Sequence, residues 1–298
     1  VIPKRMEKRT LFHNRLLPWL LLLPQLAVIS IFFFWPAAQA FIQSVQEEDP
    51  FGLRTQFVGM KNFIQLWNNE FYLQSCQTTA IFSVLVAFFG ISIALMFATF
   101  ADRITRGSGI YKTLMILPYA IAPVLAGVLW GFMFSPGIGI VSWVLRKWGI
   151  EWNHLINSHQ AMALVVMAAI WKQISYNFLF FLAGLQSIPK SLIEAAAIDG
   201  AGPWRRFWNI QFPLLSPTTF FLLVINVVYA FFETFAIIDA TTSGGPGQST
   251  NTLVYKVYQD GFKNLDLGGS AAQSVVLMLI VVVLTILQFR YVEKKVQY

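Results

Sequence analysis

Long stretches without a charged residue, separated by short polar segments, dominate this chain. The six stretches are Leu16–Gln46, Phe71–Ala101, Thr113–Leu145, Trp152–Pro189, Phe207–Phe232 and Leu267–Phe289. Only the fourth contains a charge, Lys172 near its middle. Each has room for the ~20 apolar residues that a helix needs to cross the hydrocarbon core of a bilayer. The pattern therefore predicts an all-α, polytopic membrane protein with six transmembrane helices.

Prolines and glycines set the expected limits of these helices. Pro24 and Pro36 are expected to kink the first helix or to mark its end, because proline lacks a backbone N–H. The segment Ser135–Gly139 is expected to form a turn within the third stretch. Pro213 is expected to set the start of the fifth helix. The two halves of the fourth stretch, on either side of Lys172, are expected to form one helix.

The basic segment at residues 1–15 is similar to the start of a secretory signal peptide, and Ala38-Gln39-Ala40 is similar to a cleavage site. The apolar run between them is much longer than the ~7–15 residues of a signal-peptide core. We therefore expect a retained first span. Residues 1–15 then form a cytoplasmic N-terminal segment, and residues 16–298 form one transmembrane domain.

Composition supports the membrane assignment. The chain has 298 residues, of which 56% are hydrophobic and 12% charged, whereas soluble proteins have about 25% charged residues. The net charge of +7 would suit nucleic-acid binding, but its placement indicates orientation in a bilayer instead. The single cysteine, Cys76, excludes an internal disulfide and a cysteine-ligated metal cluster.

Basic residues are unequally shared between the two sides of the predicted membrane. One side carries 14 of the 21 Lys and Arg residues and the other side carries 6. The 14 are Lys4, Arg5, Lys8, Arg9, Arg15, Arg103, Arg106, Lys112, Lys190, Arg205, Arg206, Arg290, Lys294 and Lys295. Because short cytoplasmic segments are enriched in Lys and Arg, this side is predicted to be cytoplasmic, together with both chain termini.

The segment at residues 189–213, between the fourth and fifth stretches, carries the signals of two short helices. A proline suits a first helical turn, and a serine followed three residues later by a glutamate forms a capping box. Consecutive alanines favour helix, and glycine favours its end. The expected boundaries are Pro189 or Ser191 and Gly200 for the first helix, and Pro203 and Pro213 for the second. These signals alone are also typical of a simple connector.

The same segment resembles the EAA loop of ABC importer permeases, whose motif positions here are Glu194, Ala195, Ala196, Gly200, Ile210 and Pro213. In that family the loop is a coupling helix that docks into a cleft of the ATP-hydrolysing subunit. The resemblance therefore implies an ATPase-coupling surface made of Glu194, Ala195, Ala196, Asp199, Gly200 and Ala201. Similar outer loops extend the resemblance, which is to carbohydrate-importer permeases of the maltose-transporter type. Residues 45–70 are too few for the large external domain that some of these permeases carry.

The sequence lacks the common catalytic and metal-binding patterns. It has no Gly-x-x-x-x-Gly-Lys phosphate loop and no Gly-x-Ser-x-Gly elbow, and its three histidines, His13, His154 and His159, have no zinc-site spacing. We therefore expect no enzyme activity, no catalytic residue and no metal or cofactor bound by this chain. The resemblance assigns ATP and Mg to partner subunits.

Polar residues inside the predicted spans are candidates for a substrate path, because burying them in a membrane is costly. The candidates are Lys172, Gln173 and Tyr176 in the fourth span, and Asn226, Tyr229, Phe231 and Glu233 in the fifth. Lys172 and Tyr176 are four residues apart, as are Gln173 and Asn177, so these four residues are predicted to share one helical face. Asn226, Tyr229 and Glu233 are predicted to form a second polar stripe. Tyr176 falls where the family has a sugar-lining tyrosine, and the family's fifth-span positions align nearer Val227, Phe231 and Thr234. Alternatively, Lys172 and Glu233 pair with each other or extend towards the outer surface.

A pair of small residues in the third stretch, Gly127 and Gly131, forms a Gly-x-x-x-Gly pattern. This pattern lets helices approach closely in lipid. The partner helix belongs either to this chain or to another subunit.

The resemblance implies one transmembrane subunit of an ATP-driven importer that works by alternating access in the bacterial cytoplasmic membrane. It implies as partners a second permease, two ATP-binding subunits, an extracytoplasmic solute-binding protein, an oligosaccharide substrate and membrane lipid, but no nucleic acid. Maltodextrins, glycerol phosphates and oligouronates all suit this family. The lysine within a span favours an acidic oligosaccharide such as alginate. The alternative function is a scaffold that recruits an ATPase without transport; an ion-coupled transporter is disfavoured, since it has no ATPase to dock.

Overall fold

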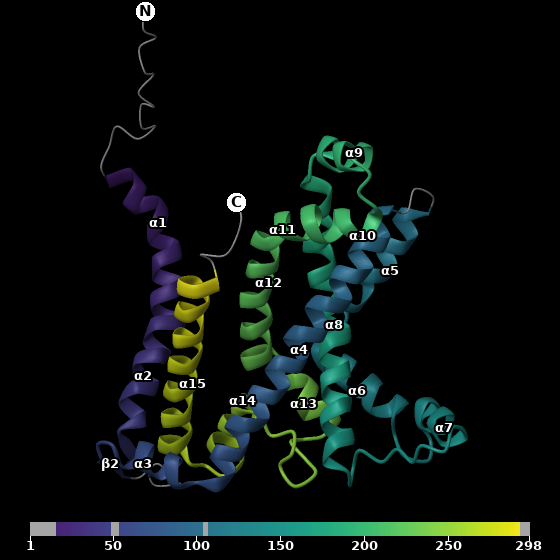
Figure 1. The fold of residues 1–298 in the computed structure, drawn as a ribbon. Helices are drawn as coiled ribbons and strands as arrows, with labels where there is room; N and C mark the ends of the chain where they lie inside the picture. Colours follow the sequence, from purple (N-terminus) through teal and green to yellow (C-terminus); the bar gives the residue numbers. More distant parts are fainter. Residues whose placement is uncertain (1–15, 49–53, 104–106, 293–298) are drawn as a thin grey trace, which may run out of the picture.

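The computed structural model describes residues 16–48, 54–103 and 107–292. The predicted cytoplasmic segment 1–15 and the basic residues Arg106, Lys294 and Lys295 lie outside these ranges. Within them the chain forms a bundle of long helices, with short helices across both of its ends (Figure 1). One end, called the α9 end below, carries α9 and α10, and there α1 begins and α15 finishes (Figure 1).

Six apolar segments of the described residues correspond to the six uncharged stretches of the sequence. They are α1–η1–α2 (Leu16–Ile29, Ser30–Phe34 and Trp35–Ser44), α4 (Glu70–Arg103), α5–α6 (Ser108–Ala120 and Pro123–Met133), α8 (Ser158–Ser187), α12–η3 (Ser216–Val228 and Tyr229–Glu233) and α15–η5 (Leu267–Leu287 and Gln288–Val292). Among the described residues, five helices are long and apolar enough to cross a membrane, and six when the bent pair α5–α6 counts as one span. The fourth span, α8, continues through Lys172 as predicted.

The prolines of the first and third spans have different effects. Pro24 lies inside α1, and Pro36 lies inside α2 just after the π-helical segment η1, so neither proline ends the first span. Pro118 and Pro123, in contrast, flank a bend of 99° between α5 and α6. The predicted turn at 135–139 is confirmed, since α6 ends at Met133 and α7 (Ile140–Lys147) follows it.

The core of the bundle lies where α4 crosses α8. Phe82 of α4 is fully buried in one apolar cluster with Val165 and Ala169 of α8. Next to it, the amides of Asn177 and Asn226 bond reciprocally, with donor–acceptor distances of 3.1 and 2.8 Å. A buried amide without a partner would be costly in a membrane. This pair therefore fixes the register of the fourth and fifth spans.

The Gly-x-x-x-Gly pattern is used for packing within this chain. A Cβ atom at Gly127 would lie 2.8 Å from the Cβ atom of Ala240 and 3.0 Å from the carbonyl oxygen of Ile237. Both residues belong to α13 (Phe235–Thr241). The glycine thus lets α6 lie directly against the end of the fifth span.

A small β-hairpin departs from the all-α prediction. β1 (Gln46–Glu48) pairs antiparallel with β2 (Thr55–Phe57) after the first span, and α3 (Lys61–Asn68) follows. The side chain of Asn62 donates to the carbonyl oxygens of Ser44 and Gln46, each at 2.9 Å. The hairpin is too short, and too rich in charge, to show the alternation by which strands are predicted.

A buried ion pair ties the chain before the last span to that span. α14 (Leu253–Tyr258) and η4 (Gln259–Lys263) precede α15. Lys256 Nζ lies 2.8 Å from Asp260 Oδ2, and the Gln273 amide of α15 donates to the same oxygen at 2.6 Å. The Asp260 carboxylate thus receives hydrogen bonds from Lys256 of α14 and from Gln273 of α15. These bonds hold η4, α14 and α15 together at the end of the bundle opposite α9.

Candidate functional site

The segment between α8 and α12 folds into the expected corner of two short helices. α9 (Lys190–Ile198) starts directly after Pro189, and α10 (Pro203–Arg206) starts at Pro203. No side chain caps the N-terminus of α9, so the Ser191–Glu194 capping box does not form. Because the helix starts earlier than Ser191, this serine lies within the first turn instead of preceding it.

Gly200 ends α9, as predicted, in a left-handed conformation with φ of +82°. The backbone N–H of Asp199 donates to the Ala195 carbonyl at 3.0 Å, and that of Ala201 donates to the Ala196 carbonyl at 2.9 Å. Bonds of this kind satisfy the last carbonyls of a helix. The corner is therefore closed by its own backbone.

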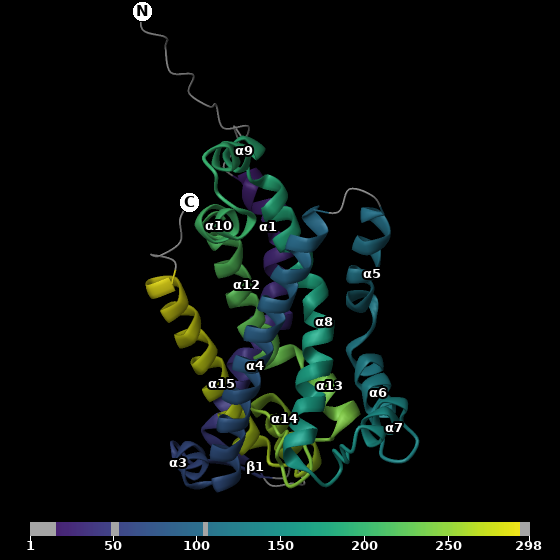
Figure 2. The same ribbon diagram turned by 45° about the vertical axis from the view of Figure 1, so that its right-hand side comes forward.

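The predicted coupling residues lie at the surface of this corner. Glu194, Ala195, Asp199 and Gly200 are exposed, and Ala196 and Ala201 are partly exposed. Ile198 is 87% exposed. α9 projects beyond the ends of the spans in both views (Figures 1 and 2). Small side chains around an exposed isoleucine make a surface that another protein can approach closely.

Pro213 does not end the second helix, contrary to expectation. The chain stays helical from α10 through η2 (Phe207–Gln211) and α11 (Phe212–Leu214). Pro213 lies at the start of α11, where its missing N–H costs little. The chain then turns into α12, so the fifth span starts at Ser216.

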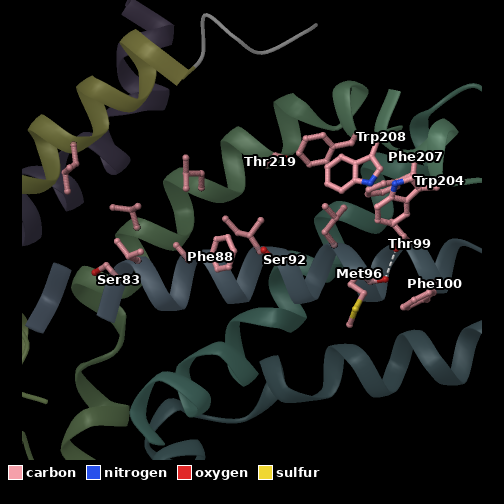
Figure 3. Close-up of a pocket in the computed structure, with 18 of the residues that line it drawn as sticks. Ser83, Phe88, Ser92, Met96, Thr99, Phe100, Trp204, Phe207, Trp208 and Thr219 are labelled. Atoms are coloured by element: carbon pink, nitrogen blue, oxygen red, sulfur yellow. Dashed lines mark hydrogen bonds between the residues drawn. The ribbon is translucent and has the colours of Figure 1, made fainter. Parts of the chain in front are cut away.

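A groove with a volume of about 1430 Å³ is lined by residues of α4 and α12, and residues of α10 and η2 lie at one of its ends (Figure 3). It is called the α4–α12 groove below. Trp204, Phe207 and Trp208 gather at its α9 end (Figure 3). Val227 and Phe231 line it further along. The groove is mainly apolar, and its few polar side chains include Ser83, Ser92, Thr99, Arg103 and Thr219.

The predicted polar stripe of the fifth span is not one face in the structure. Asn226 is fully buried, and Tyr229 is buried with its hydroxyl donating to the Ala169 carbonyl at 3.3 Å. Glu233 is exposed, whereas Phe231 lines the α4–α12 groove. The prediction of one polar face assumed α-helical spacing along the whole fifth span. The π-helical segment η3 has a longer turn and therefore moves Glu233 off that face.

The fourth span also presents two different faces. Gln173, only 6% exposed, lies inside the bundle with Asn177. Lys172 and Tyr176 instead face α5, where the Tyr176 ring lies 6.0 Å from that of Tyr119. The four residues predicted to share one face therefore lie on two faces of α8. Lys172 and Tyr176 lie on one, and Gln173 and Asn177 lie on the other.

An aromatic row extends from the bend of the third span to the fifth span. It consists of Tyr119, Tyr176, Phe180 and Phe221, with successive ring centroids 6.0, 4.8 and 5.1 Å apart. Tyr119 is 57% and Phe221 40% exposed. Rings of this kind can pack on the apolar face of a polyol or sugar, while tyrosine hydroxyls bond its hydroxyl groups.

Sequence reasoning identified Tyr176 but missed the rest of the row. Phe180 carries a local signal, because it lies one helical turn from Tyr176 and so on the same face. Tyr119 and Phe221 come from other spans, and no local spacing connects them to Tyr176. Within the described residues, no group of three or more His, Cys, Asp or Glu side chains is placed to hold a metal ion.

Comparison with known sequences gives a consistent result over almost the whole chain. Residues 86–298 match the family described as "Binding-protein-dependent transport system inner membrane component". The chain is 62% identical over 282 residues to the sn-glycerol-3-phosphate transport system permease protein UgpA of Yersinia pseudotuberculosis, covering 95% of this chain and 96% of the relative. It is also 62% identical over 287 residues to UgpA of Agrobacterium fabrum, covering 96% and 98%.

Solved structures show the same fold at lower sequence identity. A bacterial ABC transporter for import of the acidic polysaccharide alginate superposes with a TM-score of 0.82 at 22% identity, covering 93% of this chain and 95% of the other. The MetNI methionine ABC transporter, in an inward-facing conformation, superposes with a TM-score of 0.54 at 16% identity, covering 80% and 99%.

Proposed function

Because this chain belongs to the family of binding-protein-dependent inner membrane components and is a permease subunit of an ABC importer, we propose that it imports sn-glycerol 3-phosphate. The observation that carries the substrate is the 62% identity, over 95% of the chain, to permeases named for that compound. Glycerol phosphates are one of the substrate classes that suit this family. The preferred class, an acidic oligosaccharide such as alginate, has weaker support, since 22% identity to an alginate importer is a likeness of fold.

The chain is one of several subunits in the complex that we propose. A second permease completes the pathway, two ATP-binding subunits hold ATP and Mg, and a periplasmic binding protein delivers the substrate. A structural neighbour has been solved with its substrate-bound periplasmic protein, which supports the last assignment. The absence of a phosphate loop from this sequence supports placing ATP hydrolysis in the partners.

The α9 end faces the cytoplasm in this proposal. Two observations support it: the uneven distribution of Lys and Arg, and the location of α9, the start of α1 and the end of α15 at one end of the bundle (Figure 1). Both chain termini then lie in the cytoplasm, as the sequence predicts.

The corner at α9 is the proposed contact with an ATP-binding subunit. Glu194, Ala195, Ala196, Asp199, Gly200 and Ala201 form this surface. α9 begins three residues after the end of α8, and α10, η2 and α11 lead from it into α12. A displacement of α9 by the ATPase is therefore passed to the fourth and fifth spans at once. This linkage is the basis of alternating access in the proposal.

The aromatic row and the residues beside it are the proposed wall of the substrate path. Tyr176 packs against the substrate, and Lys172 lies on the same side of α8, where both residues contact Tyr119. Phe231 belongs to the α4–α12 groove. The buried candidates Gln173, Asn226 and Tyr229 support this wall from inside the bundle.

ATP hydrolysis in proteoliposomes tests this proposal. The complex is reconstituted with its binding protein, and its ATPase rate is measured with sn-glycerol 3-phosphate, maltose or an alginate oligosaccharide. We expect several-fold stimulation by sn-glycerol 3-phosphate alone. Stimulation by the alginate oligosaccharide alone would contradict the proposal that sn-glycerol 3-phosphate is the substrate. Hydrolysis that responds to none of the three would favour a recruiting scaffold over a transporter.

A further inference from the structure

The bend in the third span leaves backbone carbonyl groups without helical partners. α5 ends at Ala120, and α6 begins at Pro123, which has no N–H to offer. Ala122, with ψ of 141°, is extended. The carbonyls of Tyr119 and Ile121 therefore have no N–H four residues ahead in a continuous helix. An unpaired carbonyl is costly in a membrane, because lipid offers it no hydrogen-bond donor.

A lysine from the neighbouring span supplies the missing donors. Lys172 Nζ donates to the Ile121 carbonyl at 2.7 Å and to the Tyr119 carbonyl at 3.3 Å. The ammonium also lies 5.6 Å from the centroid of the Tyr119 ring. A cation at the C-terminal end of a helix interacts favourably with the helix dipole. Three kinds of contact thus hold the Lys172 side chain at the bend.

The two arms of the bent span pack on different neighbours. α5 lies along α8, whereas α6 packs mainly against α13 at the end of the fifth span. The bend therefore joins α5, which packs on α8, to α6, which packs on α13. Lys172 reaches this bend from the middle of α8.

We propose that Lys172 is a positioning residue that sets the angle between α5 and α6, by bonding the carbonyls freed at the bend. In this role it links the fourth span to the third, so that the two arms move as defined bodies when the transporter changes conformation. The ammonium has a third N–H, and a direct substrate contact would use that group. The two roles predict different kinetics for a variant without the charge.

The test compares Lys172→Met, which removes the donors, with Lys172→Arg, which keeps them. Lys147→Met is the matched control, because Lys147 is an exposed lysine of α7 outside the bend. Spin labels are placed at Leu114 of α5 and Val128 of α6, which are 56% and 51% exposed, in a Cys76→Ser background. Distances are measured by double electron–electron resonance in the complete complex in nanodiscs. Uptake kinetics are measured with sn-glycerol 3-phosphate.

We expect a broadened distance distribution and a maximal uptake rate reduced at least several-fold in Lys172→Met, with little change in KM. Lys172→Arg and Lys147→Met should match the unmodified complex in both measurements. An unchanged distribution in Lys172→Met, or a raised KM alone, would overturn the proposal. If Lys172→Met does not assemble, Lys172→Arg decides: an unchanged distribution supports the proposal, and a broadened one overturns it. If sn-glycerol 3-phosphate is not the substrate, the distance measurement still tests the role of Lys172 at the bend.

Discussion

Several polar side chains within the spans bond to protein partners, because lipid offers no hydrogen-bonding groups to them. Asn177 bonds Asn226, Tyr229 bonds a carbonyl of α8, and Lys172 bonds two carbonyls at the bend. Each of these residues stands out in the sequence as a polar group within an apolar span. The hydrogen bonds of these four residues hold helices together. Tyr176, in contrast, has a partly exposed ring that lies beside other aromatic rings.

The amide pair gives a prediction for stability. Asn226→Leu leaves the Asn177 amide buried without its partner, which costs about 1–3 kcal/mol. We expect a lower melting temperature for the detergent-solubilised complex. The double variant Asn177→Leu/Asn226→Leu should regain part of the loss, because no unpaired amide remains. A double variant less stable than Asn226→Leu would contradict this interpretation of the pair.

A buried histidine in the loop before α8 gives a prediction for pH. His154 is only 3% exposed. Burial lowers the pKa of His154, opposed in part by the Phe134 carbonyl. The folded state thus favours the neutral ring, and its contribution to stability is complete above the ordinary pKa of about 6.5. Below that pH the unfolded state binds more protons, so stability falls.

Melting temperatures between pH 7.5 and 5.5 test this effect. We expect His154→Gln to lose less stability than the unmodified protein on acidification, because glutamine does not titrate. His159→Gln is the matched control, since His159 is exposed. Equal losses in the unmodified protein and in His154→Gln would show that the buried ring does not contribute.

Local spacing predicted some site residues but not their surroundings. The i, i+4 relation between Lys172 and Tyr176 is correct, and both lie beside Tyr119. Their separation from Gln173 depends on which spans pack on each side of α8. The stripe at Asn226 and Glu233 failed because the π-helical turn at η3 has no reliable signature in a single sequence.

At the scale of elements, the α9 corner is the part most dependent on one backbone conformation. Gly200 has φ of +82°, and a side chain there costs roughly 1–2 kcal/mol. Gly202, two residues later, is extended with φ of −64°, and a Cβ atom added there would meet no other atom within 4 Å. Any residue can adopt that conformation, so Gly202 is a matched control.

We therefore expect Gly200→Val to insert normally but to lose most uptake and most ATPase co-purification. Gly202→Val should retain both. Uptake and pull-down are measured at equal membrane abundance of the two variants. Full activity of Gly200→Val would mean that the corner is only a connector.

Element boundaries were predicted well where one residue type dominates the conformation. Gly200 and Pro203 mark real boundaries because their backbone preferences are strong. The Ser191 capping box was wrong because Pro189 starts α9 first. The expected helix end at Pro213 is wrong, because proline is also favourable at the first positions of a helix, and here it lies at the start of α11.

At the scale of the whole molecule, apolar length predicted the five long apolar helices of the described residues, including the continuous α8, and a sixth span where the bent pair α5–α6 counts as one. It could not predict the 99° bend, which depends on two prolines and on Lys172 from another span. The small hairpin after the first span was also missed. Its hydrogen bonds with Asn62 come from a later helix and leave no local pattern.

Cysteine accessibility tests the proposed orientation. The background is Cys76→Ser, since Cys76 is the single native cysteine. Cysteines replace Arg205 at the α9 end and Lys263 at the other end, both of which are exposed. In intact cells we expect an impermeant maleimide to label position 263 and not 205. Labelling of 205 from outside would reverse the orientation.

The most direct test of the central claim is accumulation of labelled sn-glycerol 3-phosphate in proteoliposomes. ATP is enclosed, and the binding protein and substrate are added outside. We predict accumulation above the external concentration that depends on enclosed ATP, is mostly lost in Gly200→Val and is retained in Gly202→Val. Assembled complexes that hydrolyse ATP and bind the delivery protein, yet accumulate no sn-glycerol 3-phosphate, would contradict the account.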